Sequence, residues 1–127
     1  MNDSPQKKKI LLIEDDGFIA QMYGFKFKDT PYEFLVTTSG EEGWEIIKNQ
    51  KPDVILLDII LPGIDGFELL TRIKNDPELE SIPVLLLTNL GQQDNIQKGM
   101  ALGASDYIIK AHYTPQEVVD KVESFLK

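Results

Sequence analysis

Acidic residues that could bind a metal ion follow two short apolar segments of the chain. Glu14 and Asp15 come directly after residues 10–13. Asp58 comes directly after residues 54–57. If both segments are neighbouring parallel strands, these carboxylates meet at the sheet edge where open α/β sheets bind their ligands. Three carboxylates gathered there repel one another, and a hard divalent cation that keeps several waters is the natural counter-charge.

Two further side chains could complete a site for a phosphoryl group. Thr88 follows the apolar residues 84–87 and offers a hydroxyl, and Lys110 follows residues 107–109 and offers a positive charge. Taken singly, each polar residue could simply end a strand or cap a helix. Taken together they suit phosphoryl transfer, which needs an in-line nucleophile and cations that balance the spreading negative charge. Carboxylates form aspartyl-phosphates, so Asp58 is the candidate acceptor.

Five apolar segments are typical of strands that are buried on both faces. They are short, rich in leucine and β-branched residues, and show no alternation with polar residues, as in the inner strands of a parallel sheet. The second segment is the most mixed and is expected at an edge. The five segments are residues 10–13, 34–36, 54–57, 84–87 and 107–109.

Helix-start signals lie between these segments. Ser39, Asp65 and Thr114 are each followed three residues later by glutamate, which is the pattern of a capping box. Asp16 is expected to begin the first helix, and Gly103 to end the fourth. Alternating strands and helices predict a single α/β domain with a parallel sheet and right-handed crossovers.

Two of the expected helices carry features that the structure can test. The first should place Ile19, Met22, Tyr23 and Phe27 on its inner face, because these residues recur at helical spacing. The fourth should be weak, because its start is poorly marked and Gly99 within it costs roughly 1 kcal/mol relative to alanine.

Composition and charge exclude several classes of site. The 127 residues fit one domain, and 42% of them are hydrophobic. The absence of cysteine and the single histidine exclude disulfides, cysteine-ligated metals and multi-histidine sites. A net charge of −8 argues against direct binding of this chain to nucleic acid or to an anionic membrane. No signal peptide or membrane-spanning segment is recognisable, so a cytoplasmic protein is expected.

Four motifs in order make the chain resemble the receiver domain of a two-component response regulator. They lie in residues 10–16, 52–66, 82–88 and 103–110. The resemblance implies a flavodoxin-like (βα)5 sandwich, a doubly wound α/β fold whose five-stranded parallel sheet has the order 2-1-3-4-5. It implies a receiver domain over residues 8–127, after a disordered or loose tail over residues 1–7.

The resemblance also assigns a metal site. It implies that Asp15 and Asp58 ligate Mg²⁺ directly, together with the backbone carbonyl of Ile60, and that Glu14 acts more through water. Mn²⁺ is an expected substitute.

The remaining roles concern the phosphoryl group and the switch. By resemblance Asp58 is the phospho-acceptor, Lys110 binds the phosphoryl group, and Thr88 and Tyr107 are the switch hydroxyl and the switch aromatic residue. Movement of these two residues is expected to remodel the face formed by the fourth helix, the fifth strand and the fifth helix. The chain would then catalyse only its own phosphorylation and dephosphorylation, and is not an enzyme in the ordinary sense.

The partners follow from the same resemblance. A sensor histidine kinase or a phosphotransfer protein is the expected donor, and a downstream protein or domain the expected output. The chain is expected to be a monomer or a weak, phosphorylation-dependent dimer.

Four positions depart from the family pattern or set its kinetics. Ala111 follows the lysine where proline, often after a cis bond, is usual, so either a strained cis bond or a rerouted trans loop is expected there. Asn89 stands where the family usually has a small residue, and it could narrow access to Asp58, hydrogen-bond the loop, or be a tolerated variant of the loop. Ile60 and Leu90 are apolar at positions that influence the attacking water, which favours slow hydrolysis of the phospho-form.

Other functions fit less well. A receiver-shaped docking module that no longer turns over phosphate remains open because of Ala111 and Asn89. A flavodoxin-like FMN protein is rejected, because Glu14, Asp15 and Asp16 would repel the FMN phosphate. A haloacid-dehalogenase-type phosphatase is rejected, because the Asp-x-Asp pair is missing after the first strand.

Overall fold

A computed structural model describes residues 7–127, so the tail expected over residues 1–7 lies outside the described residues except for Lys7, which is exposed. Five strands alternate with five helices, as the apolar segments and caps predict. In chain order the elements are β1 (Lys9–Ile13), α1 (Gly17–Phe27), β2 (Glu33–Thr37), α2 (Gly40–Gln50), β3 (Val54–Leu57), α3 (Gly66–Lys74), β4 (Val84–Thr88), α4 (Gln93–Ala101), β5 (Asp106–Ile109), a 3₁₀ turn (Lys110–His112) and α5 (Pro115–Ser124).

All five strands are parallel and form one sheet in the order β2-β1-β3-β4-β5. This confirms the flavodoxin-like topology and places β2 at an edge. The register pairs Ile13 with Leu57 and Thr88 with Ile109. The residues that follow these strands therefore arrive at one edge of the sheet.

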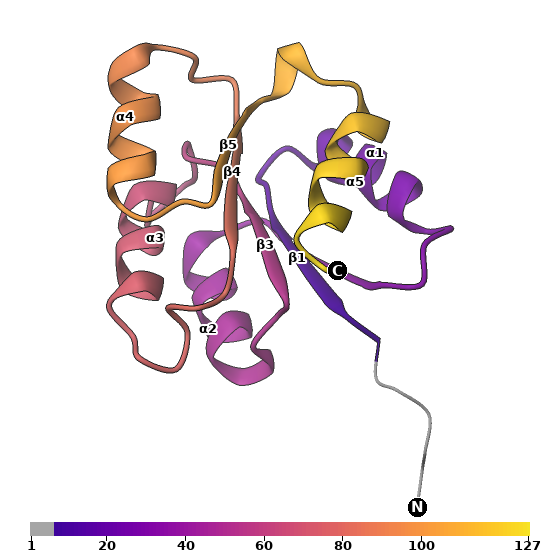
Figure 1. The fold of residues 1–127 in the computed structure, drawn as a ribbon, viewed down its shortest axis with the longest axis horizontal. Helices are drawn as coiled ribbons and strands as arrows, with labels where there is room; N and C mark the ends of the chain where they lie inside the picture. The colour runs from indigo at the N-terminus through magenta and orange to yellow at the C-terminus, as the bar shows by residue number, and fades with distance from the viewer. Residues whose placement is uncertain (1–6) are drawn as a thin grey trace, which may run out of the picture.

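Helices cover both faces of the sheet, with α1 and α5 on one face and α2, α3 and α4 on the other (Figure 1). Successive side chains of β1 alternate between the two cores: Leu11 packs under α2 and α3, and Leu12 under α1 and α5. Both are fully buried. This is why the strand segments carry apolar residues at every position rather than at every second one.

The helix boundaries agree with the capping signals. The side chains of Asp16, Ser39, Asp65 and Thr114 each accept a backbone hydrogen bond from the first turn of α1, α2, α3 and α5. Gly103 follows α4 with a φ of 106°, a conformation that glycine adopts without strain. The expected inner face of α1 is wrong at one position: Met22 is 38% exposed, and Ala20 is buried instead.

Gly99 in α4 has a packing reason. It is buried, and a Cβ at this position would lie 2.5 Å from Cδ1 of Leu86 and 3.2 Å from Cδ2 of Tyr107. The side chain of Gln92, which precedes the helix, makes no capping hydrogen bond, in keeping with the poorly marked start. The α4 backbone thus packs closely against the sheet at the expense of helix propensity.

Two glycine substitutions should change stability in opposite directions. Gly24→Ala in α1 should raise the free energy of unfolding by roughly 0.5–1 kcal/mol, because its new Cβ meets only the Phe34 ring at 3.8 Å. Gly99→Ala gains the same propensity but crowds the buried Leu86, at a cost of about 1–3 kcal/mol. We therefore expect it to destabilise the fold by about 1 kcal/mol in urea unfolding. Equal stabilisation by both changes would contradict the packing argument.

No helix in residues 7–127 combines the length and the apolar character that crossing a membrane requires.

Candidate functional site

The carboxyl ends of the strands surround a pocket of about 220 Å³. Every residue expected to touch the metal or the phosphoryl group lines it, whereas Tyr107 does not. Asn89 and Ile19 also line it, and for Ile19 the sequence predicts only a place on the inner face of a helix. The lining residues are Glu14, Asp15, Asp16, Ile19, Asp58, Ile60, Thr88, Asn89 and Lys110.

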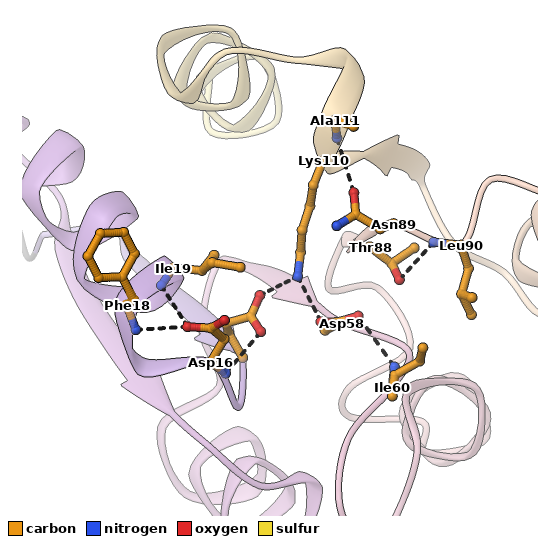
Figure 2. Close-up of polar contacts among 11 residues, drawn as sticks. Asp16, Phe18, Ile19, Asp58, Ile60, Thr88, Asn89, Leu90, Lys110 and Ala111 are labelled. Carbon is orange, nitrogen blue, oxygen red and sulfur yellow. Dashed lines mark hydrogen bonds and ion pairs between the residues drawn. The ribbon is translucent and has the colours of Figure 1, made fainter.

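Lys110 holds two carboxylates of this pocket at once. Its Nζ lies 2.5 Å from Oε1 of Glu14 and 2.8 Å from Oδ2 of Asp58. Figure 2 shows its side chain reaching from the end of β5 down to Asp58. The side chains of Lys110, Glu14 and Asp58 are only 11%, 1% and 10% exposed. Water screens such an ion pair much less than it screens one at the surface.

Burial and charge act in opposite directions on these groups. Desolvation alone lowers the pKa of Lys110, but the hydrogen bonds to Asp58 and Glu14 outweigh it and raise that pKa above its ordinary value. Burial also raises the pKa of Glu14, and Lys110 opposes this rise. The ammonium is therefore the group that keeps two buried carboxylates side by side.

The three acidic residues form a cluster suited to a cation. One carboxylate oxygen from each of Glu14, Asp15 and Asp58 lies within 4.8 Å of the others. When all three are ionised, the single charge of Lys110 leaves two negative charges unbalanced. Carboxylate oxygens are the ligands that hard divalent cations prefer, and a divalent cation would balance the two remaining negative charges. This donor set therefore fits the expected metal.

Backbone N–H groups close in sequence contact the carboxylates. The N–H of Asp16 donates to Oε2 of Glu14 at 3.2 Å, and the N–H of Ile60 donates to Oδ1 of Asp58 at 3.3 Å. The N–H of Gly66, the first residue of α3, donates to the carbonyl of Ile59 at 2.8 Å. A helix N-terminus therefore packs directly on the segment that carries Asp58.

The two expected switch residues contact the same segment of chain. Thr88 is buried, and its hydroxyl accepts a hydrogen bond from the N–H of Leu90 at 3.4 Å. The half-buried Tyr107 donates its hydroxyl to the carbonyl of Leu90. The N–H of Leu90 is thus bonded to Thr88, which lines the pocket, and its carbonyl is bonded to Tyr107, which does not.

The peptide bond between Lys110 and Ala111 is trans, as are all bonds of residues 7–127. Of the two arrangements expected here, the chain therefore adopts the trans loop, which forms the 3₁₀ turn. Lys110 nevertheless reaches both carboxylates, so the missing proline has not displaced it. The N–H of Ala111 donates to Oδ1 of Asn89 at 3.2 Å, so the side chain of Asn89 forms a hydrogen bond with a neighbouring loop.

A comparison with known protein families identifies the class to which this fold and pocket belong. A family model described as the response regulator receiver domain matches residues 10–123. The chain belongs to the response regulator receiver domain family, as the four motifs predict.

Similar proteins support this assignment. The phosphate regulon transcriptional regulatory protein PhoB of Pseudomonas aeruginosa is 37% identical over 120 residues, which cover 94% of this chain and 52% of that protein. The chain thus spans about half the length of this relative.

Two solved structures have the same fold. The phosphorylated cyanobacterial phytochrome response regulator RcpA has a TM-score of 0.86 at 31% identity, over 94% of both chains. The BeF3-activated N-terminal receiver domain of Klebsiella pneumoniae RstA also has a TM-score of 0.86 at 31% identity, over 94% of this chain and 99% of that one.

Replacing Lys110 should expose the charge imbalance of the pocket. Lys110→Met leaves Glu14 and Asp58 buried without a cation and should cost roughly 3 kcal/mol of unfolding free energy in EDTA. Mg²⁺ should then restore more stability to the variant than it adds to the wild type, because the metal meets unrelieved repulsion. Both effects can be measured by urea unfolding with and without Mg²⁺.

Lys121→Met is the matched control. Lys121 also forms an ion pair, with Asp106 at 3.0 Å, but both side chains are about one-third exposed. Its loss should cost about 1 kcal/mol at most and leave the Mg²⁺ effect unchanged. An identical Mg²⁺ effect in Lys110→Met and the wild type would show that Lys110 does not balance the metal site.

Proposed function

We propose that this chain is a phosphorylation switch that accepts a phosphoryl group on Asp58. The observation that carries the proposal is the geometry of Asp58 itself. Its carboxylate is buried, lines the pocket, and is paired at 2.8 Å with the ammonium of Lys110. This ammonium can also bind the negatively charged oxygens of an incoming phosphoryl group. Membership of the receiver family supports the same conclusion.

In the transfer step, a carboxylate oxygen of Asp58 attacks phosphorus in line with the leaving group. The donor is the phosphohistidine of a sensor histidine kinase or a phosphotransfer protein. The phosphorus–nitrogen bond breaks, and the freed imidazole nitrogen keeps the electron pair. Lys110 stabilises the negative charge on one phosphoryl oxygen, and Thr88 can donate its hydroxyl to another.

Glu14, Asp15, Asp58 and the backbone carbonyl of Ile60 would hold the Mg²⁺ ion, for which Mn²⁺ is a substitute. The bound cation supplies charge neutralisation for the phosphoryl oxygens. Glu14 already bonds to Lys110, so its part is to place both the ammonium and the water ligands of the metal.

The signal then passes through Leu90. If the Thr88 hydroxyl turns to donate to the phosphoryl group, it can no longer accept the N–H of Leu90 in its present geometry. Leu90 also holds the hydroxyl of Tyr107. A shift of this loop therefore reorients Tyr107 and alters the surface formed by α4, β5 and α5, where an output protein or domain would bind.

The α1 helix offers a surface for the phosphoryl donor beside the pocket. Phe18 and Phe25 are 81% and 69% exposed, and their spacing of seven residues places them on one side of α1, opposite the buried Tyr23. Exposed aromatic rings are typical of protein docking surfaces, and the N-cap and first turn of this helix supply Asp16 and Ile19 to the pocket lining. The receiver domain, over residues 8–127, would act in the cytoplasm as a monomer or a weak phosphorylation-dependent dimer, without contacting nucleic acid or membrane itself.

Phosphorylation of Asp58 can be tested directly. With Mg²⁺ and acetyl phosphate, intact mass spectrometry should detect a single added phosphoryl group on the wild type and none on Asp58→Ala. Omitting Mg²⁺ or adding EDTA should also abolish the adduct. If no small donor or BeF3 modifies the wild type, the chain is instead a receiver-shaped docking module, the second candidate function.

The phospho-form should lose its phosphoryl group slowly. Ile60 lines the pocket and is exposed, whereas Leu90 follows the lining residue Asn89 and is half-buried. Both side chains are apolar, so neither can orient a water for attack on phosphorus. Ile60→Asn and Leu90→Glu each supply a polar group and should speed hydrolysis about tenfold, which is less than the full effect of a general acid or base because these groups would only orient the water. The decay of the phosphoryl adduct after removal of the donor measures this rate. Rapid decay in the wild type that neither change alters would contradict the argument.

A further inference from the structure

Asn89 and Ala111 contact each other across two loops. Asn89 directly follows Thr88 at the end of β4, and Ala111 directly follows Lys110 at the end of β5. The N–H of Ala111 donates to Oδ1 of Asn89 at 3.2 Å, as the dashed line between them shows (Figure 2). The two positions at which the sequence departs from the family pattern therefore form a single contact.

The backbone explains why this contact is useful. Ala111 lies in the 3₁₀ turn Lys110–His112, and the first N–H groups of a helix have no acceptor within it. No side chain caps the turn from Ile109, the residue before it. Proline at position 111 would have no N–H to satisfy. Alanine does, and the amide oxygen of Asn89 accepts it.

We propose that Asn89 is a positioning residue that holds Lys110 over Asp58. By accepting the N–H of Ala111, it fixes the turn from which the Lys110 side chain reaches Glu14 and Asp58. Asn89 also follows Thr88 directly, so a movement of Thr88 towards a phosphoryl group pulls on the same hydrogen bond. The contact thus couples the placement of the ammonium to the switch hydroxyl. The functional part of this inference rests on the proposed phosphorylation of Asp58.

A simpler role for Asn89 predicts the opposite sign. Asn89 lines the acidic pocket, so its side chain could merely restrict the entry of a donor to Asp58. Under that role a smaller side chain speeds phosphorylation. Leucine has the same branched shape as asparagine and is somewhat bulkier, so it leaves phosphorylation slow. Under the positioning role alanine and leucine both slow it, because both remove the acceptor.

The test compares Asn89→Ala, Asn89→Leu and the control Asn49→Leu, which changes an exposed asparagine on α2. Amide hydrogen exchange at Ala111 should be about three- to tenfold faster in both Asn89 variants, the change expected for one hydrogen bond. The rate of phosphorylation by acetyl phosphate with Mg²⁺ should fall by a similar factor. Asn49→Leu should alter neither quantity.

A double-mutant cycle identifies the route of the effect. If Asn89 acts through Lys110, then Asn89→Leu should not lower the residual rate of Lys110→Met any further. An equal fractional loss in both backgrounds would overturn the proposal. So would unchanged exchange at Ala111, or faster phosphorylation of Asn89→Ala.

One readout keeps the positioning role separate from the proposed function. The ¹⁵Nζ resonance of Lys110 reports its contacts with the two carboxylates and requires no phosphorylation. It should shift in both Asn89 variants and stay fixed in Asn49→Leu. If the wild type accepts no phosphoryl group but these shifts occur, the proposed function fails and the positioning role stands; an unshifted resonance overturns the positioning role.

Discussion

The site depends on one ammonium shared by two buried carboxylates. Without Lys110, the fold would bring Glu14 and Asp58 together from neighbouring strands with no cation between them. Leaving buried charges without a partner strongly lowers the free energy of unfolding. With Lys110 in place, the pocket still carries an excess of negative charge, which a metal ion can neutralise. Lys110 thus offsets part of the negative charge of the pocket, and the part that remains can be balanced by a metal ion.

Much of this architecture follows from local sequence signals. The strands are recognisable because both faces of each inner strand are buried, which leaves uninterrupted apolar segments. The helices begin at Asp16, Ser39, Asp65 and Thr114 because each side chain satisfies a backbone N–H of the first turn. Parallel strands then deliver their carboxyl ends to one edge, so residues far apart in sequence become neighbours without further information.

The features that could not be predicted arise from contacts between elements. The prediction for the inner face of α1 was wrong at Met22. This helix is apolar on nearly all sides, so the spacing of apolar residues does not show whether Met22 or Ala20 is buried. The close packing of Gly99 depends on how near α4 lies to Leu86, which no helix propensity encodes. The contact between Asn89 and Ala111 joins two loops, and the sequence marks each residue only as unusual.

The exposed rings of α1 also affect how the isolated protein behaves in solution. Phe18 and Phe25 present aromatic surface to water, and the net charge of −8 makes two copies of the chain repel each other. Concentrated salt screens that repulsion over a few ångströms, and acidification towards the isoelectric point near 4.6 removes it. Low salt and neutral pH should therefore favour the free monomer, because loss of the repulsion would let the exposed rings of two copies approach each other.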